Sequence, residues 1–221
     1  MDPKTAETIM NEALPLRSRR YIFSAFENAF EAYRQFMANN LKFFDTDGQT
    51  NVNSRILRYA IDRSFIKLNS APKYPFVSEM RSVNNFKYKV VHIFANNVLM
   101  NISKTSKYNK IPDASAYRVK YANNNQDFNQ QITIFNTSNG QHFGQEPYYL
   151  IITYGVNEDE LTHLSLMMPD EDMKKYYHII DIKNEIVVIN TEKEKNKEKK
   201  VASIKEELIK KFIKDVDHEK Q

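Results

Sequence analysis

The sequence predicts an α+β fold, with N-terminal helices packed on a mostly antiparallel sheet of about five to seven strands and a C-terminal helix. Apolar residues recur at helical spacing over the first 70 residues. Alternating and β-branched runs follow, joined by turns instead of helices, which favours antiparallel pairing. We therefore expect a single α+β domain over residues 1–190, helical over 1–70 and sheet over 71–190. A charged linker at 191–200 and a helix at 201–221 complete the expected organisation.

The helices of the first part are predicted from apolar spacing and from their end signals. Residues 3–14 form a short pattern that Pro15 stops. Ser18 is the expected N-cap of a longer helix that runs to about Asn39. Its apolar stripe consists of Ile22, Phe26, Ala29, Phe30, Tyr33 and Met37. The next helix is expected over 53–68, and its buried side consists of Ile56, Leu57, Ala60, Ile61 and Phe65.

Strands are predicted wherever apolar and β-branched residues run between turn signals. The expected strands are 86–94, 98–102, 132–135, 148–154, 161–168, 177–182 and 186–189. The last two would form a hairpin through residues 183–185. The polar stretch 103–131 leaves two alternatives open, a helix that begins at Pro112 and continues to Tyr121, or a strand over 117–121.

Composition excludes several classes of function. The chain has no cysteine, which removes disulfides and thiolate chemistry, and only four glycines, none of them in a phosphate-binding loop. No two of its five histidines lie three or four residues apart, so there is no local metal-ligand pair. No signal peptide and no apolar run of about 18 residues is present, so we expect a cytoplasmic protein without membrane contact.

The charge of the chain is divided by region. Residues 71–140 contain nine lysines and arginines against three acidic residues, a net charge of +6, whereas residues 141–190 contain three against nine, a net charge of −6. Cations interleaved with aromatic residues suit phosphates and unpaired bases. The candidate nucleic-acid-binding residues are Lys87, Lys89, Lys104, Lys107, Lys110, Arg118 and Lys120.

One short pattern has the form of a catalytic motif. Asp170 precedes Asp181 by eleven residues, and Lys183 follows Asp181 by two. In a strand this last spacing places Asp181 and Lys183 on one face. The pattern resembles the motif of the PD-(D/E)xK nucleases, and this resemblance implies that the two aspartates hold Mg²⁺ while Lys183 stabilises charge on a phosphate.

These observations leave three functional hypotheses. The favoured one is a non-enzymatic protein of a phage, mobile element or defence locus that binds DNA or RNA through the basic residues and needs no cofactor. The alternative is a protein-interaction or inhibitor module with an acidic surface, which leaves self-association open. The third is the Mg²⁺-dependent nuclease.

Overall fold

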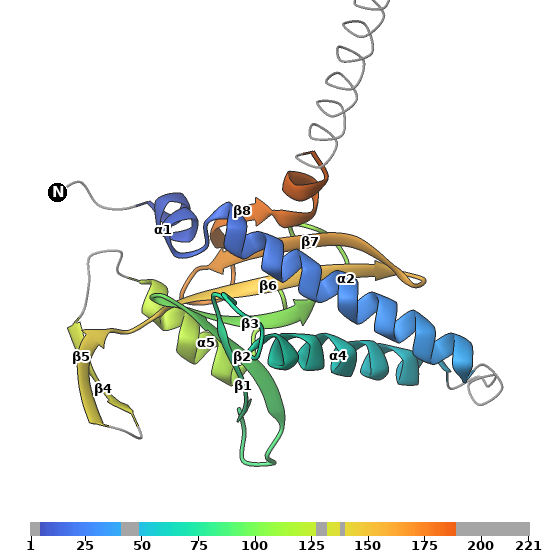
Figure 1. Cartoon of the computed structure of the whole chain (residues 1–221). Helices are drawn as coiled ribbons and strands as arrows, with labels where there is room; N and C mark the ends of the chain where they lie inside the picture. Colours follow the sequence, from blue (N-terminus) through green and yellow to red (C-terminus); the bar gives the residue numbers. More distant parts are fainter. Residues whose placement is uncertain (1–4, 41–48, 127–131, 138–139, 189–221) are drawn as a thin grey trace, which may run out of the picture. The chain divides into compact units, whose positions relative to one another are not determined.

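The computed structural model describes residues 5–40, 49–126, 132–137 and 140–188. Its helices are α1 (Ala6–Ala13), α2 (Leu16–Asn39), α4 (Gln49–Leu68), α5 (Ala116–Ala122) and the short 3-10 helix η1 (Asn123–Asn125). Its strands are β1 (Val77–Ser82), β2 (Lys89–Ala95), β3 (Val98–Lys104), β4 (Ile132–Thr137), β5 (Gly140–Gln145), β6 (Tyr148–Asn157), β7 (Glu160–Pro169) and β8 (Tyr176–Asp181). The predicted α+β fold is confirmed, with the N-terminal helices preceding a mostly antiparallel sheet (Figure 1).

The main sheet has six strands in the order β1-β2-β3-β6-β7-β8, and β4 pairs only with β5. Every neighbouring pair is antiparallel except β3 and β6, which run parallel. A parallel pair needs a crossover, and here the chain between the two strands includes α5, η1 and the β4–β5 hairpin. Strand β6 is buried from Tyr148 to Gly155, as its continuous apolar sequence requires for a central strand covered on both faces.

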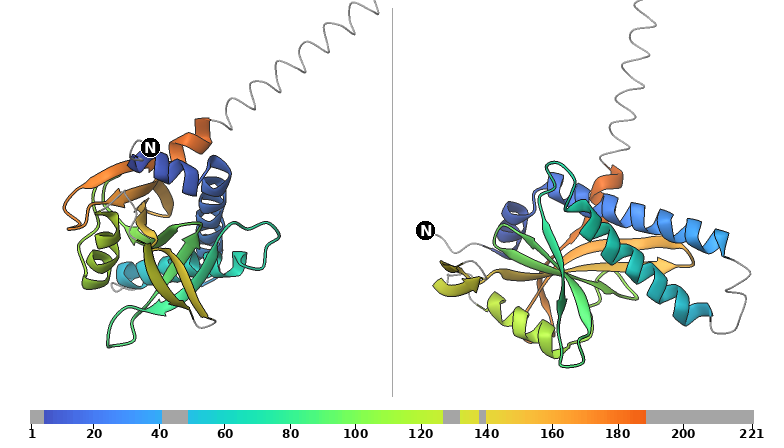
Figure 2. Two further views of the ribbon diagram at one scale, coloured as in Figure 1. Left: turned by 90° about the vertical axis from the view of Figure 1, so that its left-hand side faces the viewer. Right: turned by 60° about the horizontal axis from the view of Figure 1, so that its bottom comes forward.

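Helices cover both faces of this sheet. Phe26 of α2 packs against Tyr154 of β6 with ring centroids 5.3 Å apart, and Phe26 also meets Phe65 of α4. On the other face, Tyr121 of α5 packs against Tyr149 at 5.6 Å. Because residues 149 and 154 are an odd number of positions apart, their side chains point to opposite faces of the strand. Helices α2 and α4 therefore lie on one face and α5 on the other (Figure 2).

The junction between α1 and α2 corrects one predicted helix start. Ser18 does not cap α2; the N-cap is Pro15, whose carbonyl accepts the backbone N–H groups of Ser18 and Arg19. Proline suits this place because its fixed φ is compatible with a helix start and its missing N–H would have had no partner. The buried Arg19 donates to the carbonyl of Leu14 at the end of α1 and to Asn11, so this cation links the two helices.

Residues 182–188 are helical, so the predicted strand 186–189 and its hairpin turn at 183–185 are wrong. Ile182 and Ile186 are buried whereas Val187 and Val188 are about half exposed. Burial at a four-residue spacing suits a helix turn, and it overrides the strand preference of consecutive β-branched residues. The C-terminal linker 191–200 and the helix 201–221 lie outside the described residues.

The sequence reasoning did not predict strands β1 and β5. For the stretch 103–131, where a helix and a strand were both open, the structure has the helix α5. The strand predicted from residue 86 begins at Lys89, because residues 84–87 form the turn between β1 and β2. The chain up to Lys183 forms one compact unit, and the described residues 184–188 belong to a second. None of the helices in the described ranges is long and apolar enough to cross a membrane.

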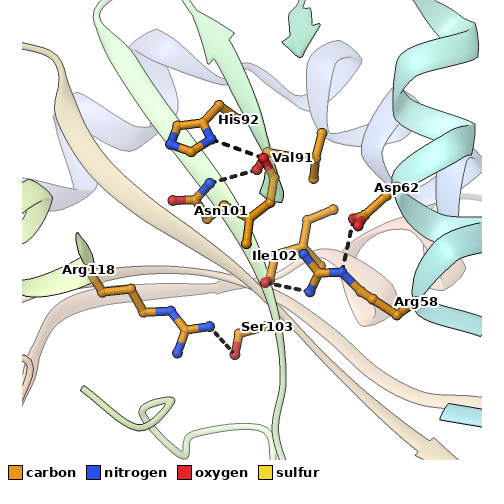
Figure 3. A network of polar contacts seen from close by, with 9 residues as sticks. Arg58, Asp62, Val91, His92, Asn101, Ile102, Ser103 and Arg118 are labelled. Carbon is orange, nitrogen blue, oxygen red and sulfur yellow. Dashed lines mark hydrogen bonds and ion pairs between the residues drawn. The ribbon is translucent and has the colours of Figure 1, made fainter. Parts of the chain in front are cut away.

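Strand β2 separates from β3 over much of its length, and polar side chains occupy the split (Figure 3). The ladder between them pairs only residues 93–95 with 98–100, although β1 and β2 stay paired down to Lys89. The side-chain amide of Asn101 donates to the carbonyl of Val91 at 2.6 Å. From α4, Arg58 donates to the carbonyl of Ile102 at 2.8 Å and to Asp62 at 2.9 Å. These bonds satisfy strand carbonyls that the ladder leaves open.

Candidate nucleic-acid interface

A cavity of about 750 Å³ opens at the edge of the sheet where the parallel strands β3 and β6 both end. The walls come from four segments: the end of β3, the loop that follows it, the end of β6 and the start of β7. The lining residues are Lys104, Thr105, Ser106, Lys110, Ile111, Pro112, Asp113, Val156, Asn157, Thr162 and His163. We call this cavity the β3–β6 pocket.

His163 is the most firmly held polar group of the β3–β6 pocket. Its Nε2 lies 2.9 Å from the hydroxyl of Thr105, and its Nδ1 lies 3.3 Å from that of Thr162. The ring rests over Gly155 on the neighbouring strand, where a Cβ atom would overlap the imidazole. The backbone N–H of Thr105 donates to the carbonyl of Tyr154, which fixes the hydroxyl in place. The absent side chain at position 155 thus makes room for the histidine.

Burial favours the neutral form of His163. Burial lowers the pKa of His163 below its ordinary value of 6.5, Asp181 raises it in part, and Lys183 lowers it again. A neutral imidazole offers one donor and one acceptor, which matches the two hydroxyls beside it. The positive charge at the pocket comes therefore from Lys104 and Lys110, not from the histidine, and Asp113 supplies one negative charge on the same wall.

The structure brings five of the seven predicted cations into one part of the molecule. Lys104, Lys107 and Lys110 lie at the end of β3 and in the next loop, and Arg118 and Lys120 lie on α5, which follows that loop. Lys87 lies in the β1–β2 turn and Lys89 begins β2, on the part of that strand that does not pair with β3. All six lysines are exposed. Within the part of the chain that the structure describes, none of these lysines forms an ion pair.

Arg118 differs from the lysines because its guanidinium is used inside the protein (Figure 3). It donates to the hydroxyl of Ser103 on β3 at 3.1 Å and to the carbonyl of Asp113 at 2.8 Å. It also lies over the ring of Tyr117, 5.5 Å from its centroid. Arg118 therefore ties the pocket loop to the sheet and is less available to an external phosphate.

The nuclease residues lie at opposite ends of β8. Asp170 accepts the backbone N–H groups of Lys174 and Lys175, so its carboxylate closes the β7–β8 turn. Tyr176, the first residue of β8, pairs with Pro169 next to Asp170. Asp181 ends β8 five residues later, so about 17 Å of strand separates the position of Tyr176 from that of Asp181. Carboxylates that share one Mg²⁺ lie within about 4–6 Å of each other. Lys183 belongs to the helical segment, so alternation along one strand no longer relates it to Asp181; its ammonium donates to the carbonyl of Leu161.

Six of the nine acidic residues between positions 141 and 190 lie at the two ends of β7. Glu158 and Asp159 form the β6–β7 turn and Glu160 begins β7, whereas residues 170–172 follow the other end of that strand. In the described part of the chain, no group of three or more histidines and carboxylates is arranged to hold a metal ion. The net charge of −6 over residues 141–190 is thus divided between both ends of the sheet.

The sequence reasoning did not identify three residues at the β3–β6 pocket, namely Thr105, Gly155 and His163. One signal was present, since an isolated glycine directly after a strong strand pattern indicates a bulge or a close approach of another group. The strand predicted over 148–154 ends one residue before Gly155, which leaves the glycine outside it. It lies inside β6, next to a register shift in the pairing with β7.

A second concave surface lies between α2 and α4, the two helices that cover one face of the sheet. This α2–α4 groove has a volume of about 700 Å³ and a mainly apolar lining that includes Ala32, Phe36 and Tyr59. Phe36 and Tyr59 are 44% and 65% exposed. Three cations of α4 line it as well, namely Arg55, Arg63 and Lys67.

Comparison with known proteins adds no relative: no family model matches the chain, and no curated protein and no solved structure shows significant similarity to it.

Proposed function

We propose that this protein binds nucleic acid without catalysis, holding phosphate groups at the β3–β6 pocket. The observation that carries the proposal is that Lys104 and Lys110, exposed and without acidic ion-pair partners in the described ranges, line a cavity of mixed polar and apolar character at the ends of two parallel strands. Cations in such a position release condensed counterions when they meet phosphates.

The walls of the pocket suit a phosphate and its sugar. The hydroxyls of Ser106 and Thr162 and the amide of Asn157 line the cavity and can contact phosphate or sugar oxygens. Lys107 and Lys120 extend the positive charge along the same loop and onto α5. The anchoring of the loop by Arg118 holds these groups on a fixed frame.

Fluorescence anisotropy with labelled 20-mers, as single-stranded DNA, RNA and duplex, tests the proposal over about 50 to 300 mM salt. The logarithm of the binding constant should fall linearly with the logarithm of the salt concentration, and the slope should shrink by about 0.7–0.9 for each phosphate that the protein no longer neutralises. Lys104→Gln with Lys110→Gln should therefore lower the slope by about 1.4–1.8.

A charge-matched control removes two lysines from the opposite edge of the sheet. Lys73 precedes β1 and Lys175 follows the β7–β8 turn, so both lie far from the ends of β3 and β6. Lys73→Gln with Lys175→Gln should leave the slope close to that of the unmodified chain. Absence of binding at 50 mM salt, or an equal decrease in both double variants, would refute the proposal.

The α2–α4 groove supports a second candidate function, the docking of a partner protein. Its apolar floor and its row of cations on α4 are complementary to an amphipathic helix with acidic residues along one border. Tyr59→Lys should abolish co-purification of such a partner from the native source, whereas Lys104→Gln with Lys110→Gln should preserve it. Equal recovery with both variants, or a partner without an acidic amphipathic helix, would count against this candidate.

A further inference from the structure

The turn between β1 and β2 presents the most exposed large apolar side chain among the described residues. Phe86 is 92% exposed and Tyr88 is 59% exposed. Burying a phenylalanine is among the larger gains available to a fold, and here the chain forgoes it. The hairpin extends away from the remaining sheet in Figure 1, because the residues of β2 that precede Ile93 do not pair with β3.

Hydrogen bonds fix the backbone of the turn that carries Phe86. The backbone N–H of Val83 donates to the carbonyl of Tyr88 at 2.9 Å, and that of Lys87 donates to the carbonyl of Asn84 at 3.2 Å. The side chain of Asn84 accepts the N–H of Tyr88 at 2.9 Å. Lys87 adopts a left-handed φ of 57°, which completes the reversal of the chain. Phe86 is thus held at the crest of the turn in a defined position.

The surroundings of Phe86 are cationic and polar. Between residues 80 and 90 the sequence contains Arg81, Lys87 and Lys89 and no acidic residue. Arg81 pairs with Glu79 and lies over Phe94, whereas the two lysines have no ion-pair partner in the described part of the chain. Asn84 and Asn85 precede the aromatic ring directly.

We infer that Phe86 is a stacking residue that packs against an unpaired base while Lys87 and Lys89 contact the adjoining phosphates. This inference rests on the proposed nucleic-acid binding and assigns a second contact surface to it. Every base has an apolar face, so one exposed ring with flanking cations suits single strands of any sequence. A bilayer is a poorer match, since inserting Phe86 would carry the amides of Asn84 and Asn85 out of water.

The chain contains no tryptophan, so a single substitution creates a specific reporter. In Phe86→Trp, addition of single-stranded oligonucleotide should quench the indole fluorescence as the base stacks. Tyr176→Trp, on a partly exposed residue of β8, is the matched control and should change little. Vesicles of phosphatidylcholine with 30% phosphatidylserine form the second arm; a blue shift of Phe86→Trp with vesicles, without quenching by the oligonucleotide, would overturn the inference in favour of a membrane contact.

Affinity gives an independent readout. Phe86→Ala should weaken binding of single strands by at least about fivefold, and binding of duplex much less, because paired bases are already stacked. Its exposure predicts an unchanged melting temperature. If the chain binds nucleic acid through Lys104 and Lys110 but Phe86→Ala binds single strands equally well, the stacking role is refuted and the proposed function stands. If no salt-dependent binding occurs at all, the proposed function itself fails.

Discussion

Replacing Gly155 by alanine should destabilise the protein through its contact with a single side chain. The ring of His163 occupies the space where the Cβ would lie. The substitution therefore displaces the imidazole and breaks its 2.9 Å bond to the buried hydroxyl of Thr105. Leaving a buried polar group unpaired costs about 1–3 kcal/mol, and overpacking costs a further 1–3 kcal/mol. Alanine recovers roughly 0.5–1 kcal/mol relative to glycine in a strand, so we expect a net loss of about 1–5 kcal/mol.

A double-mutant cycle isolates this cause. In the background His163→Ala the obstructing ring is gone, and the hydroxyl of the exposed Thr162, which also lies close to the Cβ position, can rotate away. Gly155→Ala should then change the free energy of unfolding by no more than about 1 kcal/mol, so most of the loss seen in the unmodified chain should appear as coupling energy between the two positions.

Urea unfolding followed by circular dichroism at pH 7.5 measures all four chains, and equal m values confirm that only stability has changed. An equal cost of Gly155→Ala with and without His163 would refute the reasoning, since the loss would then arise from the backbone and not from the ring. A negligible cost in the unmodified chain would show that the imidazole moves aside freely.

Two further predictions concern buried polar groups. Burial lowers the pKa of both His92 and His163 below 6.5, so the unfolded chain binds protons that the folded chain does not. The free energy of unfolding should be fully retained above about pH 6.5 and decline as the pH falls below it, by up to about 1.4 kcal/mol per pH unit for each histidine. Urea midpoints measured from pH 7.5 to 5 test this. If neither His92→Gln nor His163→Gln reduces the dependence of stability on pH, the prediction is contradicted. Asn125 is fully buried, donates to the carbonyls of Tyr149 and Pro169 and accepts the N–H of Tyr149. Asn125→Ala should therefore lower the free energy of unfolding by about 3 kcal/mol in the same assay. The neighbouring Asn124 donates to the carbonyl of Pro147 at 3.2 Å, so Asn124→Ala should lower it by about 1 kcal/mol or less. Similar losses at the two positions would contradict this account.

The local sequence determined the elements whose pattern is long and unambiguous. The stripe of α2 from Ile22 to Met37 is buried as its three- and four-residue spacing requires, because a helix turns its side chains to one face at that period. The unbroken apolar run of β6 demanded a strand covered on both faces. The order of helices before strands joined by turns was sufficient for the fold class. Within the candidate site, the sequence drew attention to Lys104 and Lys110, because cations are visible without a structure.

Only the tertiary structure decided which distant residues meet. The parallel pairing of β3 with β6 brings Thr105 and Gly155 to one edge, and no local pattern encodes a pairing between segments some fifty residues apart. His163 becomes part of a pocket only because a glycine lies opposite it across the ladder. The helical turn at 182–188 shows the same limit, since β-branched residues favour strands only where a pleated surface is available to pack them. Local spacing fixes the shape of an element, whereas the neighbours across the sheet decide what its side chains contact.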